Sequence, residues 1–315
     1  MKKITLLLSF IACVGFMQAQ LLVNENFNYT LGVGLVGQGN WLITGTSTTN
    51  PITVTASTIT YVNYPSSGLG LEVSLANTGQ DANCSFTAQT SGTIYVSALV
   101  NITAAQTAGD YFIHIADSPT GTTFFGRTFV KLDGTKIAFG IQNTSGGTPT
   151  QTYTTSTYDL GTTYLLVLKV NVATGESSLI VNPAMNSEPA TGWVTNLSGT
   201  GALPAAGFSA VSLRQGSATN AATLLVDGIH VATSWGGLFN LTSFSNPSTS
   251  AFDVTVVGKK LLVKNVVNGS TVEIFSALGA KVQSSELIDG KVSLNNLSKG
   301  MYIVRVGKNT QKIML

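Results

Sequence analysis

After its first twenty residues, the chain alternates apolar and polar positions in short runs separated by turn residues. This period of two is typical of half-buried β-strands, whereas the helical period of about 3.6 residues is nearly absent. Asp133-Gly134 and Thr174-Gly175 each separate two alternating runs, and their residues tolerate the backbone of a tight hairpin turn. The pattern therefore predicts an all-β protein built of antiparallel sheets.

Residues 1–19 follow a different pattern. Two lysines open the segment, an apolar stretch covers residues 4–16, and the small residue Ala19 closes it before Gln20. This layout is typical of a secretory signal peptide, and its apolar part is shorter than the roughly 20 residues that span a bilayer. We expect cleavage before Gln20, and no later stretch approaches the length of a membrane span.

Charge divides the rest of the chain into two parts. Residues 20–240 carry five Lys and Arg against ten Asp and Glu, whereas residues 241–315 carry nine against four. The alternation lapses near the same point into a stretch rich in Ser, Asn and Pro. We expect a large β-sandwich over residues 20–235, a linker over 236–250 and a small β-sandwich over 251–315.

The last part carries two motifs. The segment 272–282, VEIFSALGAKV, resembles the V-x-I-[YF]-x-x-x-G-x-x-V core of the type A sorting domain of the type IX secretion system. The segment 295–306, NNLSKGMYIVRV, is similar to its L-x-x-G-x-Y-[IL]-V-x-V signature, and the chain closes on a lysine followed by apolar residues. The matching positions are Gly279, Leu297, Gly300, Tyr302, Val304 and Lys312.

This resemblance implies an immunoglobulin-like fold and a route. The protein would cross the periplasm and outer membrane of a Gram-negative bacterium and end at the cell surface or outside. Its partners would be the type IX translocon and the machinery that processes C-terminal signals. The lysines of this part are scattered and lack interleaved aromatic residues, so we expect no nucleic-acid binding.

Three segments of the larger part resemble concanavalin A-like (LamG-type) jelly-roll modules. They are an opening strand at 22–29, a hairpin at 166–183 and a closing strand at 225–231 that would return beside the first. Jelly rolls serve as lectins, glycan hydrolases and spacers, so the resemblance predicts the fold more than the function.

No catalytic motif stands out in this module. The Glu-x-Asp-x-x-Glu cluster of laminarinase-like jelly rolls is absent, and no motif links Cys84 to His114 or His230. Cys84 is also the only cysteine after the signal segment, so no intramolecular disulfide can form. We assign no catalytic residue and expect a binding protein more than an enzyme.

Two sites for ligands remain. Glu25 on the first strand and Asp227 on the last would lie close together if those strands pair, which makes a structural Ca²⁺ ion the one cofactor to consider. Exposed aromatic rings near polar groups would stack on sugars of an extracellular glycan. For this second site we select Trp41, Tyr61, Asn63, Tyr64, Phe124 and Arg127. The prediction is a carbohydrate-binding or adhesive module, with a glycan-active enzyme or a spacer without ligand as alternatives.

Overall fold

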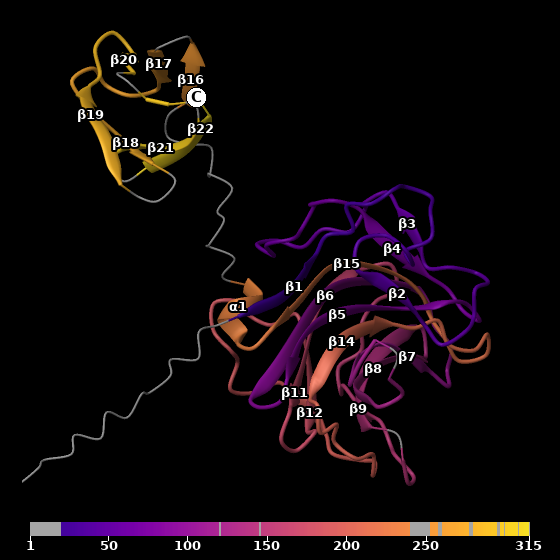
Figure 1. Ribbon diagram of the computed structural model, residues 1–315. Helices are drawn as coiled ribbons and strands as arrows, with labels where there is room; N and C mark the ends of the chain where they lie inside the picture. The colour runs from indigo at the N-terminus through magenta and orange to yellow at the C-terminus, as the bar shows by residue number, and fades with distance from the viewer. Residues whose placement is uncertain are drawn as a thin grey trace, which may run out of the picture. The chain divides into compact units, whose positions relative to one another are not determined.

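The computed structural model describes residues 20–239 apart from 120 and 145, and residues 253–314 apart from 258–259, 277–279, 295–296, 299 and 308. The chain forms two compact units, divided between Leu241 and Thr242. Both are built of antiparallel strands, as the alternation predicts (Figure 1). Among the described residues, no helix has the length and apolar character that a membrane span requires.

The first unit is a jelly-roll sandwich of two sheets. In the described residues the larger sheet has the order β13-β12-β11-β6-β15-β4-β3, and β1 pairs with β15 beside this path. Its strands are β1 (Leu21–Glu25), β3 (Thr53–Thr55), β4 (Glu72–Leu75), β6 (Thr93–Ala104), β11 (Thr163–Asn171), β12 (Ser177–Val181), β13 (Val194–Asn196) and β15 (Thr223–Ala232).

The second sheet has seven strands in the described residues, in the order β10-β9-β8-β7-β14-β5-β2. These strands are β2 (Trp41–Thr44), β5 (Asp81–Gln89), β7 (Asp110–Ala116), β8 (Phe124–Asp133), β9 (Lys136–Thr144), β10 (Thr152–Tyr153) and β14 (Phe208–Leu213). The chain passes repeatedly from one sheet to the other, so neighbouring strands are often far apart in the sequence.

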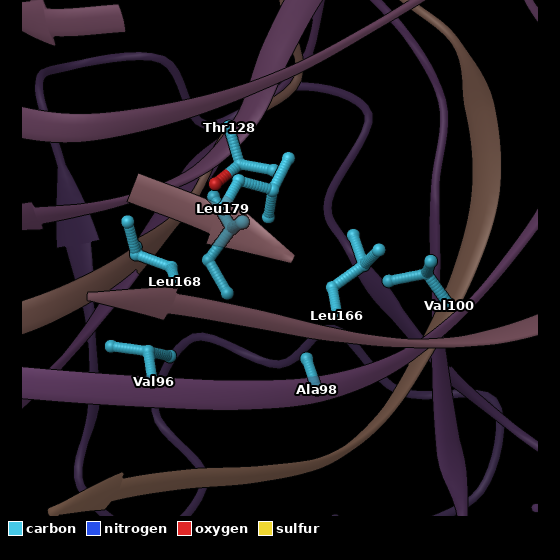
Figure 2. A pocket seen from close by; sticks show the side chains of 8 residues that line it. Val96, Ala98, Val100, Thr128, Leu166, Leu168 and Leu179 are labelled. Carbon is cyan, nitrogen blue, oxygen red and sulfur yellow. The ribbon is translucent and has the colours of Figure 1, made fainter. Parts of the chain in front are cut away.

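Apolar side chains from both sheets pack into one core. Its largest fully buried members include Trp41, Phe27, Phe125, Phe139 and Phe208. A void of about 10 Å³ lies within this core, bounded mainly by valine and leucine side chains of β6, β11 and β12 (Figure 2). An apolar space of this size holds at most one water molecule, so this void has no room for a ligand.

The outer face of the eight-stranded sheet is also covered. A short helix, α1 (Trp235–Phe239), and the loop around Tyr64 pack on it and form a second apolar cluster. Residues 236–239, which the sequence pattern placed in a linker, therefore lie in a packed helix. Leu238 is fully buried there, because its apolar side chain completes this cluster.

Strand pairing follows the sequence pattern at several points. β8 and β9 form a hairpin through the turn at Gly134, whose φ is +65°. β11 and β12 pair across the turn at Gly175, with φ +75°. The first strand lies beside the last, with Glu25 opposite Ile229. These pairings confirm the predicted hairpins and the predicted return of the closing strand.

The second unit is a small sandwich of seven described strands. Sheets of order β16-β17-β20 and β19-β18-β21-β22 enclose a core that includes Leu261, Val272, Ile274 and Val304. The strands are β16 (Asp253–Val257), β17 (Lys260–Lys264), β18 (Thr271–Ser276), β19 (Lys281–Glu286), β20 (Lys291–Ser293), β21 (Met301–Val306) and β22 (Asn309–Met314).

Candidate functional site

Trp41 is not an exposed ring. It is fully buried, stacks on Phe27 with centroids 5.8 Å apart, and donates its indole N–H to Glu25 Oε2 at 2.8 Å. The expectation that Trp41 binds a ligand at the surface is therefore wrong. The physical reason is the alternation of β2, which turns Trp41 inward and leaves Leu42 exposed.

The loop with Tyr61, Asn63 and Tyr64 also serves the fold. Tyr64 is 4% exposed, donates its hydroxyl to the carbonyl of Gly228 at 2.5 Å and stacks on His230 at 5.2 Å. Tyr61 is half-buried against the same apolar cluster, and Asn63 is an exposed turn residue with φ +64°. The loop covers the eight-stranded sheet. Its aromatic residues pack on that sheet, which contradicts the expectation that they form a free binding surface.

Glu25 lies on β1, which pairs with β15, the strand that carries Asp227. The Glu25 carboxylate accepts hydrogen bonds from the Phe27 N–H at 2.6 Å, the Tyr29 hydroxyl at 2.7 Å and the Trp41 indole. These three donors use most of the roughly four acceptor positions of the carboxylate and leave about one for a cation.

Asp227 has a different environment. Its Oδ1 accepts the Gly228 N–H at 2.6 Å, while the buried Oδ2 has no hydrogen-bond partner in the described residues. Within that part of the chain, no three His, Cys, Asp or Glu side chains gather around a possible metal position. The geometry does not support the expected Ca²⁺ site.

Ser66 and His230 form a hydroxyl–imidazole pair that the sequence did not reveal. Ser66 Oγ lies 2.6 Å from His230 Nε2, and His230 Nδ1 lies 2.7 Å from the carbonyl oxygen of Leu238. A carbonyl only accepts, so Nδ1 carries the proton and Nε2 accepts from the serine. The serine is 1% exposed and the histidine 0%, so no substrate reaches this pair. Its role is to fasten α1 to the sandwich.

Phe124 and Arg127, in contrast, lie together on the outer face of the seven-stranded sheet. Both belong to β8, in which Phe125 and Thr128 turn toward the interior. Arg127 Cζ is 5.9 Å from the centroid of the Phe124 ring, and both side chains are partly exposed. The structure thus brings two of the predicted ligand-binding residues into one place.

Tyr111 on β7 is the centre of this outer face. Two guanidinium groups approach its ring, Arg127 Cζ at 4.9 Å and Arg214 Cζ at 4.2 Å from the centroid. Arg214 also forms an ion pair with Asp110 at 2.8 Å. These contacts hold the ring and both cations in a fixed, partly exposed arrangement. We call the set Tyr111, Phe124, Arg127 and Arg214 the rim.

A row of buried polar side chains runs beside the rim across four strands of the sheet. Ser212 lies opposite Asn83 on one side and opposite His114 on the other, and Gln142 faces Arg127 farther along. All four members of the row are at most 2% exposed. We call the set Asn83, Ser212, His114 and Gln142 the floor.

The floor has unused hydrogen-bonding capacity. Neither ring nitrogen of His114 has a partner among the described residues, and the same holds for Ser212 Oγ and Asn83 Oδ1. The His114 ring packs against Phe124 at 4.4 Å. Burial, followed by the charges of Arg127 and Arg214, lowers the pKa of His114 to about 3, so the imidazole stays neutral. A neutral imidazole offers one donor and one acceptor.

Sequence reasoning missed Tyr111 and His114 because of a β-bulge. Residues three apart point to opposite faces of a regular strand. The register between β7 and β8 shifts between Tyr111 and Ile113, and again between Ile113 and Ile115. Each shift inserts one residue into a strand and re-aims the side chains that follow. Phe124 and Arg127 share a face through the second shift, near Gly126, whose φ is +59°.

Two positions of the sorting signature, Tyr302 and Val304, lie on β21. Val304 is fully buried in the core of the second unit, and Leu297 packs against that core. The Tyr302 hydroxyl donates to the carbonyl of Ser298 at 3.0 Å, which joins β21 to the segment before it. Gly300 lies just before the strand.

The remaining two signature positions are Lys312 and Gly279. Lys312 lies on β22 with its backbone opposite Ile303. Gly279 falls outside the described residues.

Residues 243–315 match the family described as "Secretion system C-terminal sorting domain". No curated protein is significantly similar to the chain. Solved structures with a similar arrangement include a sialidase, with 13% identity and a TM-score of 0.40 over 67% of this chain and 18% of that one.

Two others are carbohydrate-related by their descriptions. The CBM2 module of the evolved Dit of Lactobacillus casei BL23 phage J-1 has 9% identity and a TM-score of 0.41, over 68% of this chain and 95% of that one. Domain 4 of AbnA, an extracellular arabinanase from Geobacillus stearothermophilus, has 16% identity and a TM-score of 0.41, over 71% and 98%.

The family match agrees with the signature on β21 and with the small sandwich that carries it. Residues 243–315 are a type IX C-terminal sorting domain, and the protein is exported through this secretion system to the cell surface or the extracellular space.

Proposed function

We propose that the first unit is a glycan-binding module that works outside the cell, with the rim on the outer face of the seven-stranded sheet as its binding face. One observation carries the proposal: two partly exposed aromatic rings, Tyr111 and Phe124, lie against the partly exposed guanidinium of Arg127. Ligand sites commonly combine apolar and aromatic surface with a few well-placed polar groups. Sugars suit this combination because their C–H faces pack on rings while their hydroxyl groups donate and accept.

Substitutions distinguish the rim from the loop around Tyr61 as the place where the glycan binds. A glycan array probed with the purified chain should show binding that Phe124→Ala and Tyr111→Ala both weaken. Tyr61→Ala is the matched control, because it removes a half-buried ring from the loop that covers the other sheet. Binding that is lost with Tyr61→Ala but kept in both rim variants would place the site elsewhere.

The same experiment tests the enzymatic alternative. Binding without release of product is the expected result of a binding module. Oligosaccharide released from an immobilised glycan would contradict the proposal and favour a glycan-active enzyme. Absence of binding to every glycan would favour a spacer.

A further inference from the structure

The five cations of residues 20–239 differ in their partners. Three of them form an ion pair: Arg214 with Asp110 at 2.8 Å, Lys136 with Asp159 at 2.6 Å, and Lys169 with Glu188 at 2.8 Å. Arg127 and Lys131 have no carboxylate within 4 Å among the described residues. Both belong to β8 and lie on the outer face of the seven-stranded sheet, in a unit that is otherwise rich in acidic residues.

Arg127 is the more confined of the two. Its Nη1 donates to Gln142 Oε1 over a long 3.3 Å, and its buried Nε has no partner in the described residues. Burial, opposed by Tyr111 and reinforced by the charge of Arg214, lowers the pKa of Arg127. A guanidinium that is partly removed from water without a counter-ion is unfavourable, and a bound anion relieves that cost.

The chemistry of the group favours an anion that presents two oxygens side by side. A guanidinium presents several N–H donors in a fixed fork that matches the two oxygens of a carboxylate or sulfate. Tyr111 and Phe124 hold this fork in place from the side, so little side-chain freedom is lost on binding.

Resting on the proposed function, we infer that the ligand is an acidic glycan, whose carboxylate or sulfate group binds Arg127 in the rim. Lys131 supplies a second positive charge four residues along the same strand. That separation is about 13 Å at the rise of an extended chain. An acidic polysaccharide with charges on successive sugars fits such a pair better than a neutral one.

The test compares acidic glycans with neutral counterparts that share their backbone. An array carries oligogalacturonate beside its methyl ester, and sulfated glycans beside their desulfated forms, and is probed with the full chain. We expect binding to at least one acidic glycan and not to its neutral partner. Calorimetry on that glycan should show an affinity that falls as salt rises, since charge interactions at partly exposed sites are screened.

Substitutions assign the effect to the rim. Arg127→Gln should weaken binding roughly 10- to 100-fold, the range for one charged hydrogen-bonded contact. Arg127→Lys should restore part of it, because the charge remains and the fork is lost. Lys136→Gln is the control, since it removes the same charge from an exposed position on the next strand. Tryptophan fluorescence checks that every variant is folded.

The outcomes separate the two proposals. Equal binding to an acidic glycan and its neutral partner, unchanged by Arg127→Gln, would overturn the acidic ligand and leave glycan binding intact. Equal weakening by Lys136→Gln and Arg127→Gln would also overturn it, because net charge alone would then explain the effect. No binding to any glycan would overturn both.

Discussion

Asp227 should make the stability of the first unit depend on pH in an unusual direction. Burial is the largest cause of its altered pKa, the Gly228 N–H opposes it, and the nearby charges of Glu72 and Glu25 add to it. Together these raise the pKa of Asp227 from 3.8 to about 7. The side chain is fully buried, and its Oδ2 has no partner among the described residues, so the charged form has little support.

The sign follows from proton binding. The folded chain holds the proton on Asp227 up to about pH 7, whereas the unfolded chain releases it near pH 4. The stabilisation that the raised pKa provides is therefore complete below about pH 4 and is lost as the pH rises to about 7. A difference of one pH unit between the pKa of Asp227 in the folded and the unfolded chain corresponds to about 1.4 kcal/mol. The free energy of unfolding therefore falls by at most about 4 kcal/mol over this pH range.

Asp227→Asn is the perturbation that isolates this effect. The amide imitates the protonated acid, and its oxygen can still accept the Gly228 N–H. The variant should match the natural protein near pH 4 and exceed its free energy of unfolding at pH 8 by up to about 4 kcal/mol. Urea unfolding followed by tryptophan fluorescence measures this, since all three tryptophans belong to the first unit.

Asp133→Asn is the matched control, because Asp133 is exposed at the end of β8 in the same unit. It should follow the natural protein at every pH. Asp81 also has a raised pKa, of about 6, and contributes in the same direction in both proteins. The difference between them therefore reports Asp227 alone. A variant that is less stable than the natural protein at pH 8, or equally stable at every pH, would refute the reasoning.

Four further outcomes test other parts of the structure. Glu25→Gln should lower the free energy of unfolding by roughly 2–3 kcal/mol, because one of the three donors to Glu25 loses its acceptor; an unchanged urea midpoint would contradict this. Removing divalent cations with EDTA should leave the midpoint unchanged, and a drop would restore the Ca²⁺ site. Gly228→Ala should destabilise by about 1–3 kcal/mol, since φ is +57° and the new Cβ would lie 2.8 Å from Tyr64; equal melting temperatures would speak against it. Deleting residues 242–315 should leave the protein in the periplasm, as cell fractionation would show, and normal export would count against the sorting role.

The sequence predicted the strands and their pairing better than it predicted which side chains are exposed. Turn residues such as Gly134 and Gly175 have the positive φ that their hairpins need, so local chemistry was enough. The pairing of β1 with β15 was predicted only from a family resemblance, because no local pattern predicts pairing across about two hundred residues. The signature around Val304 was specific because it combines a core strand with an ordered series of fixed positions.

The exposure of a side chain depends on which other segments cover its face of the sheet, and the alternation of apolar and polar residues does not predict this. Both faces of the eight-stranded sheet are covered, so Tyr64 is buried although its segment reads as a polar loop. On the seven-stranded sheet, bulges in β7 and β8 bring Tyr111 and His114 to one face, against the regular period of two. Phe124 and Arg127 were found because they are close in sequence, while Arg214 comes from a strand beyond them.

The polar clusters of the first unit differ in how fully they are satisfied, and that difference indicates their roles. Both oxygens of Glu25 and both of Glu72 accept hydrogen bonds, and both nitrogens of His230 have partners. The polar atoms of these clusters find their hydrogen-bond partners within the protein, and the bonds hold strands, loops and α1 together. Their buried acidic and imidazole groups therefore need no ligand to explain them.

The outer face of the seven-stranded sheet is the opposite case. Of the eight buried side-chain polar atoms that lack partners among the described residues, five belong to Asn83, Ser212, His114 and Arg127 on this one face. Each such atom costs about 1–3 kcal/mol. No disulfide among the described residues offsets this cost, since Cys84 is free. Random imperfection would scatter these atoms over both sheets. Instead they gather under Tyr111 and Arg127, a partly exposed ring and a guanidinium without a counter-ion, and the proposed anionic ligand would bind to this exposed pair.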